Sequence, residues 1–226
     1  MIIIKKENIR FLSNAKKMDK FKTIKQNSKA EIEEKKSRFI AELFYIENVN
    51  QAEEYIKQVK KKYFDARHHC YAYRIIQNNA IKDKQSDDGE PSGTAGAPML
   101  NILTKNQIVN VLVIVTRYFG GTLLGTGGLV KAYSEATLKA IENTEIIMQE
   151  LGYEMQITIT YADLEKFKYY AQKNSINIIN TKYENNIVCT IEINKEEKEK
   201  LLMQENFNIL EYAVLREKYI RRSDEI

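Results

Sequence analysis

The residues of this chain that could bind or act on a phosphate group lie mainly between positions 87 and 133. Acidic residues come first in this stretch, an arginine follows an apolar run, and a glycine-rich loop comes last. The stretch also contains eight of the nine glycines and both prolines of the chain. Because glycine permits positive φ and close backbone approach but weakens ordinary helices and strands, this concentration indicates specially shaped backbone. We therefore expect a site in this stretch.

The loop Gly125-Thr126-Gly127-Gly128 precedes a predicted helix over residues 129–143. Free N–H groups at a helix start attract phosphate by hydrogen bonding and through the helix dipole. Arg117 follows the apolar run Val111–Val115, so its side chain is expected to emerge where a strand buried on both faces leaves the sheet. An arginine there could bind an anion with two hydrogen bonds. The candidate phosphate- or nucleic-acid-binding residues are Arg117, Gly120, Gly121, Gly125, Thr126, Gly127, Gly128 and Lys131.

The same glycines have a second interpretation, in which they only permit tight turns and close packing of helix against strand. The loop is neither a Walker A motif nor a complete dinucleotide-binding fingerprint, because it lacks both the Gly-Lys-Ser/Thr triplet and the full G-x-G-x-x-G spacing. The sequence therefore gives little support to ATP hydrolysis, and no cofactor is expected.

A second set of polar residues could line a catalytic pocket. Asp87, Asp88 and Glu90 could hold Mg²⁺ beside a phosphate, or they could be solvated acids of a loop. The only histidines, His68 and His69, are adjacent on a predicted strand and so point to opposite faces, and no metal site is expected. A role for the nearby cysteine as a nucleophile is disfavoured as well. The possible pocket residues are His68, Asp88, Glu90, Ser92 and Thr94.

The elements that must position these residues indicate an α+β chain. In the first half, hydrophobic periodicity and turn residues predict strands, helices and one long loop. The expected elements are strands 30–34 and 38–45, a helix capped by Asn50, strand 68–76, a polar loop over 78–97, a short helix 97–103, the buried strand 111–115 and helix 129–143.

The second half predicts a different arrangement. Residues 153–161 alternate between apolar and polar side chains, which is typical of a half-buried strand. The expected elements after it are a helix from Asp163 to about Lys173, a hairpin of strands 176–183 and 187–193, a helix capped by Asn194 and a strand over 208–218. The order β-α-β-β-α-β is that of a ferredoxin-like domain.

These elements predict two domains with extensions at both ends. The expected segments are an N-terminal extension over residues 1–17, a first domain over 18–143, a ferredoxin-like domain over 145–218 and a loose tail over 219–226. We expect residues 144–152 to be an open linker, because the only glycine outside the central stretch lies there.

Composition limits the partners. The chain has 226 residues, of which 43% are hydrophobic and 29% charged, as in an ordinary globular protein. No apolar run approaches the ~18–20 residues that span a membrane, so no membrane partner is expected. Two cysteines are too few for a disulfide framework and favour the cytoplasm.

The net charge of +4 is unevenly placed. Residues 1–27 contain eight Lys and Arg against Glu7 and Asp19, a local charge of +6, so residues 28–226 sum to −2. A uniformly basic nucleic-acid binder is therefore not indicated, and any contact with nucleic acid must come from a local patch.

Three stretches carry a family resemblance: ARHHCYAY, DDGEPSGTAGAPML and VTRYFGGTLLGTGGLVKAY closely resemble the IMPACT/YigZ family. The likeness covers residues 18–143 and extends through the ferredoxin-like half to about residue 218. It implies that the first domain is an α/β two-layer domain similar to domain IV of elongation factor G, and that the second is similar to domain V. It also implies a link to translation, because eukaryotic relatives are linked to its control through a kinase pathway. Their N-terminal partner-binding domain has no counterpart in this sequence, so that partner is not carried over.

Three functions follow as hypotheses. A binding module would contact RNA or the ribosome through the glycine loop. An enzyme would use the pocket residues on a phosphate-containing small molecule, although a nucleophile beside a base is not evident from the sequence. An adaptor would bind a protein partner in translation and would need no pocket.

Overall fold

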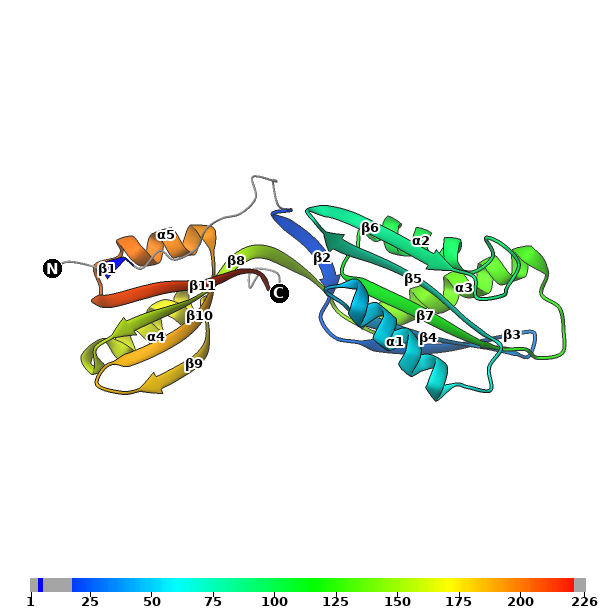
Figure 1. The fold of residues 1–226 in the computed structure, drawn as a ribbon, viewed down its shortest axis with the longest axis horizontal. Coiled ribbons are helices and arrows are strands. Elements are labelled where there is room, and N and C mark those ends of the chain that lie inside the picture. Colours follow the sequence, from blue (N-terminus) through cyan, green and yellow to red (C-terminus); the bar gives the residue numbers. More distant parts are fainter. Residues whose placement is uncertain (1–3, 6–17, 222–226) are drawn as a thin grey trace. The chain divides into compact units, whose positions relative to one another are not determined.

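The computed structural model describes residues 4–5 and 18–221, which form two compact units (Figure 1). One unit comprises Phe21–Ile147. The other joins the described residues up to Lys20 to those from Met148 onward. Both units combine helices with a sheet, which confirms the α+β class.

The unit Phe21–Ile147 is built on a five-stranded antiparallel sheet with the strand order β3-β4-β7-β5-β6. The strands are β3 (Ser28–Glu34), β4 (Ser37–Tyr45), β5 (His68–Gln77), β6 (Ala80–Ser86) and β7 (Val111–Tyr118), and β2 (Lys20–Ile24) precedes them. Every residue of β7 from Val111 to Arg117 is buried, so both faces of the sheet must be covered.

Helices cover both faces of this sheet (Figure 1). One face packs against α1 (Val49–Lys62), and the other packs against α2 (Gly96–Lys105) and α3 (Gly125–Glu142). The unit therefore has three layers where two were expected. The added layer agrees with a central strand that is apolar at every position from Val111 to Val115.

The residues expected to form a long loop over 78–97 contain a strand instead. Asn78 and Asn79 both adopt positive φ, of 52° and 63°, and this pair of conformations makes the tight turn that returns β6 beside β5. Residues of β6 are largely exposed, so this edge strand lacks the hydrophobic alternation that reveals strands in a sequence.

Two helix starts also differ from the prediction. The cap of α1 is Asn48, not Asn50, since the Asn48 side chain accepts a hydrogen bond from the N–H of Gln51 at 3.0 Å. The helix expected over 129–143 begins at Gly125 as α3, so the glycine motif forms its first turn rather than a loop before it.

The second unit has the ferredoxin-like order β8-α4-β9-β10-α5-β11. Its elements are β8 (Ile146–Ile159), a short 3-10 turn (Tyr161–Asp163), α4 (Leu164–Lys173), β9 (Asn177–Tyr183), β10 (Ile187–Asn194), α5 (Lys195–Met203) and β11 (Ile209–Arg221). The strand order β11-β8-β10-β9 places the first strand between the third and the fourth, as that fold requires. A further strand, β1 (Ile4–Lys5), pairs in parallel with β11.

The segments at the ends of this unit are more ordered than expected. Most of the expected linker, residues 144–152, belongs to β8. β11 continues to Arg221, which pairs with Gln149, so the expected loose tail begins in fact as strand. Close packing explains this extension, because a Cβ on Gly152 would lie 2.6 Å from Ile220 Cδ1. Residues 222–226, and residues 1–17 apart from Ile4–Lys5, lie outside the described residues.

Candidate functional site

Polar side chains gather at one end of the five-stranded sheet, where β7 finishes and where β4 and β5 begin. Arg117 lies opposite Phe39 of β4 on one side and opposite His68 of β5 on the other. Directly opposed residues on neighbouring strands share a face, so these side chains lie on the face covered by α2 and α3. The loops before α2 and before α3 reach the same end through contacts of Glu90 and Gly120.

Arg117 does not emerge from the sheet, and the prediction that it does is wrong. Its side chain is only 7% exposed, and its Nη1 donates to both carboxylate oxygens of Glu90 at 2.8 and 3.1 Å. Nη2 donates to the Ser37 hydroxyl at 3.4 Å. The guanidinium also lies 5.4 and 5.6 Å from the ring centres of Phe39 and Phe119. Its charge is therefore already neutralised within the fold.

Glu90 connects Arg117 to α3. The Glu90 carboxylate accepts a third hydrogen bond, at Oε1, from the Tyr133 hydroxyl at 2.8 Å. The Cys70 sulfur lies 3.3 Å from the same hydroxyl. Burial raises the pKa of the Cys70 thiol to about 12 and also raises the pKa of Tyr133. Cys70 is therefore a neutral thiol at physiological pH.

Asp87 caps the start of α2 directly, although it precedes the helix by nine residues in the sequence. Its Oδ1 accepts the N–H groups of Ala95 and Gly96 at 3.0 and 2.8 Å, and its Oδ2 accepts that of Gly93 at 2.8 Å. Burial alone would raise the pKa of this carboxyl, but the three N–H donors outweigh burial and lower the pKa. Asp87 is thus neither a solvated acid nor a free metal ligand.

The other predicted pocket residues converge only in part. Asp88 accepts hydrogen bonds from Lys60 Nζ at 2.8 Å and from the backbone N–H of His69 at 2.7 Å, and its carbonyl oxygen contacts His68 Nδ1 at 2.9 Å. Ser92 is exposed, whereas the hydroxyl of buried Thr94 donates to the carbonyl of Pro91. Asp87, Asp88 and Glu90 thus accept hydrogen bonds from different groups. Among the described residues, no group of three His, Cys, Asp or Glu side chains could hold a metal ion.

Because the folded-state pKa of Asp87 is lowered, its ionised form stabilises the fold above its unfolded pKa of about 3.9, and this contribution is lost as pH falls through the folded pKa. Asp87→Asn is therefore expected to lower the melting temperature at pH 7, with the difference from wild type shrinking below about pH 4. Circular dichroism melts from neutral to acidic pH measure this. Glu33→Gln, at an exposed carboxylate of β3, is the control. A difference that does not change with pH would contradict a charge-dependent cap.

The fold accounts for four of the five glycines between positions 120 and 128, but not for Gly127. A Cβ on Gly120 would lie 2.0 Å from the carbonyl carbon of Lys36, and one on Gly128 would lie 3.0 Å from Leu124 Cβ. Gly121 and Gly125 have positive φ, of 85° and 71°. Gly127 has no positive φ, and a Cβ there would meet nothing within 4 Å.

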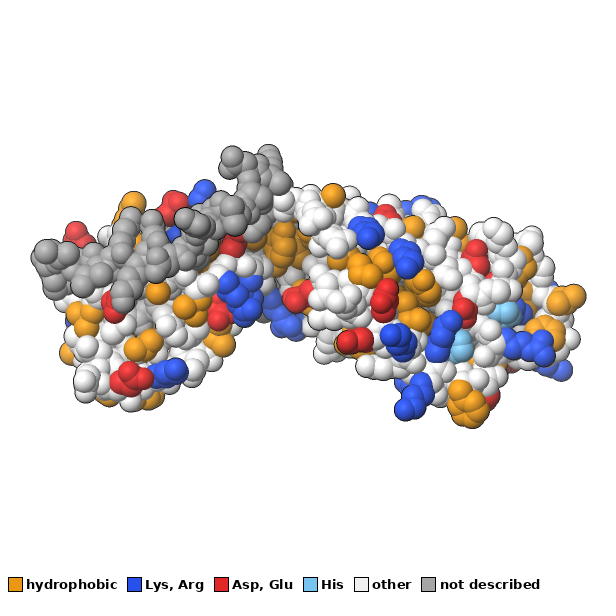
Figure 2. All heavy atoms as spheres, viewed as in Figure 1, with side chains coloured by type: hydrophobic (Ala, Val, Ile, Leu, Met, Phe, Trp, Pro, Cys, Tyr) orange, Lys and Arg blue, Asp and Glu red, His pale blue; other side chains and the backbone are white. Residues whose placement is uncertain are grey.

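Exposed basic and hydrophobic side chains surround this helix start. No described side chain caps α3, so its first N–H groups have no side-chain partner within the described fold. Leu123 and Phe119 are 83% and 51% exposed. Figure 2 shows hydrophobic and basic side chains close together at this end of the unit. We define the glycine-loop surface as the exposed residues Lys35, Lys36, Phe119, Leu123, Thr126, Gly127 and Lys131.

Sequence reasoning missed part of this surface. Lys35 and Lys36 belong to the turn between β3 and β4, far from the glycine motif in sequence. They come beside it because the backbone at Gly120 packs directly on Lys36 and its N–H donates to Ser37 Oγ at 3.2 Å. The one available signal was Phe119, an aromatic residue before two glycines in a loop.

Comparisons with known proteins cover both units. Residues 35–141 match the model of the Impact N-terminal domain, and residues 157–204 match a domain of unknown function, DUF1949. The chain is 37% identical over 177 residues to "IMPACT family member YvyE" of Bacillus subtilis, covering 78% of this chain and 80% of that protein. It is 34% identical to an "IMPACT family member" of Haemophilus influenzae, covering 74% and 81%.

A solved structure agrees with these matches. A crystal structure of a hypothetical protein aligns with a TM-score of 0.59 at 31% identity, covering 81% of this chain and 89% of that one. The range 35–141 contains every residue of the Arg117–Glu90–Tyr133 network and all the loop glycines. No helix in the described part of the chain is long and apolar enough to cross a membrane.

Proposed function

The chain belongs to the IMPACT family, and from this we propose that it is a cytoplasmic, translation-associated regulatory protein that binds RNA, either free or within the ribosome. We propose that the contact is the glycine-loop surface. The resemblance of both units to domains of a translation factor, and the link of eukaryotic family members to translation, support the regulatory part of the proposal.

The observation that carries the RNA contact is Gly127. A glycine in a helix costs up to about 1 kcal/mol relative to alanine, so a helical glycine needs a compensating reason. Neither positive φ nor a close neighbour supplies one at this position. Close approach of a ligand to the first turn of α3 would supply it, because a side chain there would obstruct an anion from reaching the N–H groups.

The chemistry around Gly127 suits a phosphate backbone with unstacked bases. Lys35, Lys36 and Lys131 supply exposed ammonium groups for phosphate, and exposed Phe119 supplies a ring on which a base can stack. Base stacking and phosphate contacts together are the usual means by which proteins hold single-stranded nucleic acid. This local patch also fits a chain whose residues beyond position 27 carry a net charge of −2.

A protein partner in translation is the second candidate. Leu123 in the glycine-loop surface and Phe64 after α1 are each 83% exposed, and large exposed apolar side chains favour protein contacts. An enzyme acting on a phosphate-containing small molecule gains less support, because Glu90, Asp88 and the Cys70 thiol are occupied or neutral within the network described above.

The experiment that separates these functions is fractionation of ribosomes from cells that contain the tagged chain, at low and at high salt. RNA binding through phosphate contacts predicts co-migration with ribosomes at low salt and release at high salt. Co-purification with one protein at both salt concentrations would instead favour the adaptor. Turnover of a phosphate compound by the purified chain would favour the enzyme.

Gly127→Ala tests the contact directly. We expect stability to stay the same or to rise by up to about 1 kcal/mol, since alanine favours the helix and its Cβ meets open space. We also expect affinity for a single-stranded oligoribonucleotide to fall at least about tenfold, equivalent to about 1.4 kcal/mol. Fluorescence anisotropy at several salt concentrations measures the affinity, and thermal melts of the same preparation measure the stability.

Lys139→Ala is the matched control, because it removes an exposed cation from the far end of the same helix. It should leave RNA affinity nearly unchanged, whereas Lys36→Ala should weaken it and reduce its salt dependence. Unaltered RNA affinity in Gly127→Ala would remove the main support for the contact.

A further inference from the structure

The last strand of the ferredoxin-like unit has a partner on each of its edges, and one partner is the start of the chain (Figure 1). The inner edge of β11 pairs with β8 over Ile209–Arg221. On the outer edge, β1 runs parallel to β11, with Ile4–Lys5 opposite residues 211–212. A sheet edge presents backbone N–H and C=O groups to which an extended segment can bind, and here the chain supplies such a segment itself.

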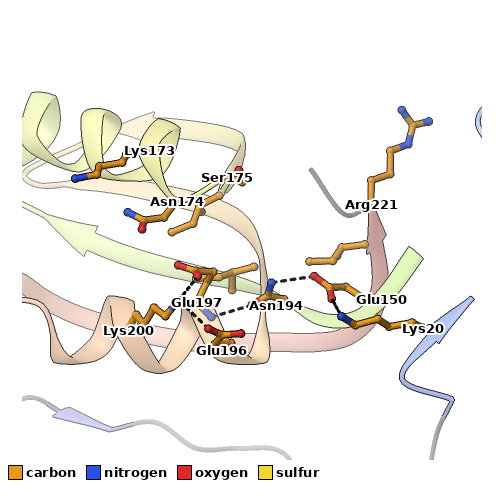
Figure 3. A pocket seen from close by; sticks show the side chains of 13 residues that line it. Lys20, Glu150, Lys173, Asn174, Ser175, Asn194, Glu196, Glu197, Lys200 and Arg221 are labelled. Atoms are coloured by element: carbon orange, nitrogen blue, oxygen red, sulfur yellow. Dashed lines mark hydrogen bonds and ion pairs between the residues drawn. The ribbon is translucent and has the colours of Figure 1, made fainter. Parts of the chain in front are cut away.

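The chain that follows β1 is anchored to the same unit at its other end. The N–H of Leu151 in β8 donates to the carbonyl oxygen of Asp19 at 2.9 Å. Lys20 Nζ lies 3.5 Å from a carboxylate oxygen of Glu150, which is 8% exposed (Figure 3). The residues on either side of the segment 6–18 therefore contact this unit, through β11 on one side and through β8 on the other.

This anchor allows β1 to leave the edge and to return to it. Leu151 lies opposite Tyr219 of β11, seven positions after Tyr212. At about 3.3 Å a residue, the anchor and the docked strand are about 23 Å apart along the sheet. The chain from Lys5 to Asp19 can span up to about 46 Å. Pairing of β1 with its own β11 is therefore an intramolecular event with a high effective concentration.

The pairing itself is short. β1 contributes two residues to the sheet, whereas β10 pairs with β8 through eight. A short strand at a sheet edge opens at a small fraction of the free energy of global unfolding, because few hydrogen bonds are broken. β1 therefore depends on its tether, and an equivalent strand at sufficient concentration can replace it.

Charge indicates which kind of segment fits this edge. Residues 1–17 contain five Lys and Arg and one Glu, a charge of +4. Residues 148–221 contain twelve acidic and ten basic side chains, a charge of −2. Opposite charges on the segment and on the unit favour the docking of a basic segment and disfavour that of an acidic one.

We propose that the outer edge of β11 is a docking site for an extended basic segment, that β1 is its resident occupant, and that the N-terminal segment of a second copy of this chain exchanges with it. Backbone hydrogen bonds to β11 supply the affinity, as in other complexes formed by strand addition, and charge supplies the selectivity. The site is independent of the glycine-loop surface, which belongs to the other unit.

Titration of the full-length chain into a fluorescent peptide of residues 1–12, followed by anisotropy, tests the exchange. The variant Ile4→Pro, Lys5→Pro removes both backbone N–H groups of β1, so β1 should vacate the edge. This variant should bind the peptide at least about tenfold more tightly than the wild type does. Ile4→Ala, Lys5→Ala is the matched control, because it loses the same side chains and the same charge but keeps both N–H groups. It should bind the peptide like the wild type.

Hydrogen exchange locates the peptide on the double-proline variant. Amides of β11 around Glu211 should exchange faster than in the wild type and should be protected again when the peptide is added, while melting temperatures show that the sheet stays folded. Equal affinity of the proline and alanine variants for the peptide would overturn the proposal, and so would protection at a site other than β11. Absence of saturable binding at millimolar peptide would also overturn it and leave β1 as a fixed cover of the edge.

Discussion

Arg117→Ala is expected to lower the free energy of unfolding by about 3–5 kcal/mol, because it would leave the buried Glu90 carboxylate without its charge partner. The two side chains are 7% and 3% exposed and are joined at 2.8 Å, so water cannot replace the lost contact without opening the loop before α2. Chemical denaturation followed by circular dichroism measures the loss.

Two further variants make this test specific. Arg67→Ala removes an exposed arginine near the same end of the unit and should change stability by less than about 0.5 kcal/mol. The double variant Arg117→Met, Glu90→Gln removes both charges and should be less destabilised than the sum of its single changes. A mild loss in Arg117→Ala would mean that Glu90 has another partner or that the loop opens readily.

RNA affinity of folded Arg117→Ala separates packing from binding. The geometry predicts unchanged affinity, since the guanidinium is occupied by Glu90 and Ser37. If the variant keeps its stability but loses RNA affinity, Arg117 binds the anion itself, as the sequence indicated.

Gly120→Ala is expected to destabilise the unit by about 3 kcal/mol, at the upper end of the cost of overpacking. Its Cβ would lie 2.0, 2.1 and 2.4 Å from the carbonyl carbon and oxygen of Lys36 and the backbone nitrogen of Ser37. These are backbone atoms, so no side-chain rotation can relieve the clash. The turn between β3 and β4 would have to separate from the loop before α3.

The same substitution at Gly127 provides the comparison. Both positions change from glycine to alanine within eight residues of one another, but only Gly120 has a close neighbour. Thermal melts of the two variants should therefore differ clearly, with Gly127→Ala at or above the wild type. Wild-type stability in Gly120→Ala would contradict the described packing of its loop against Lys36.

Periodicity and turn residues determined much of the fold by themselves. The alternation over residues 153–161 and the helical spacing after Asp163 predicted the ferredoxin-like order, which the strand order β11-β8-β10-β9 confirms. The apolar run Val111–Val115 predicted a strand buried on both faces, which β7 is. These predictions succeeded because burial imposes a local period on each element, and a local period can be read from consecutive residues.

The partners of the polar side chains were decided only by the tertiary structure. Glu90 meets Arg117 across 27 residues, and Asp87 caps a helix that begins nine residues later. Neither contact leaves a period in the sequence, because each depends on the path of a loop over the end of the sheet. The sequence also cannot tell one glycine's role from another's. Gly120 and Gly127 are the same residue type, and only the folded structure shows that a Cβ at Gly120 would clash with the backbone of Lys36 while one at Gly127 would meet nothing within 4 Å.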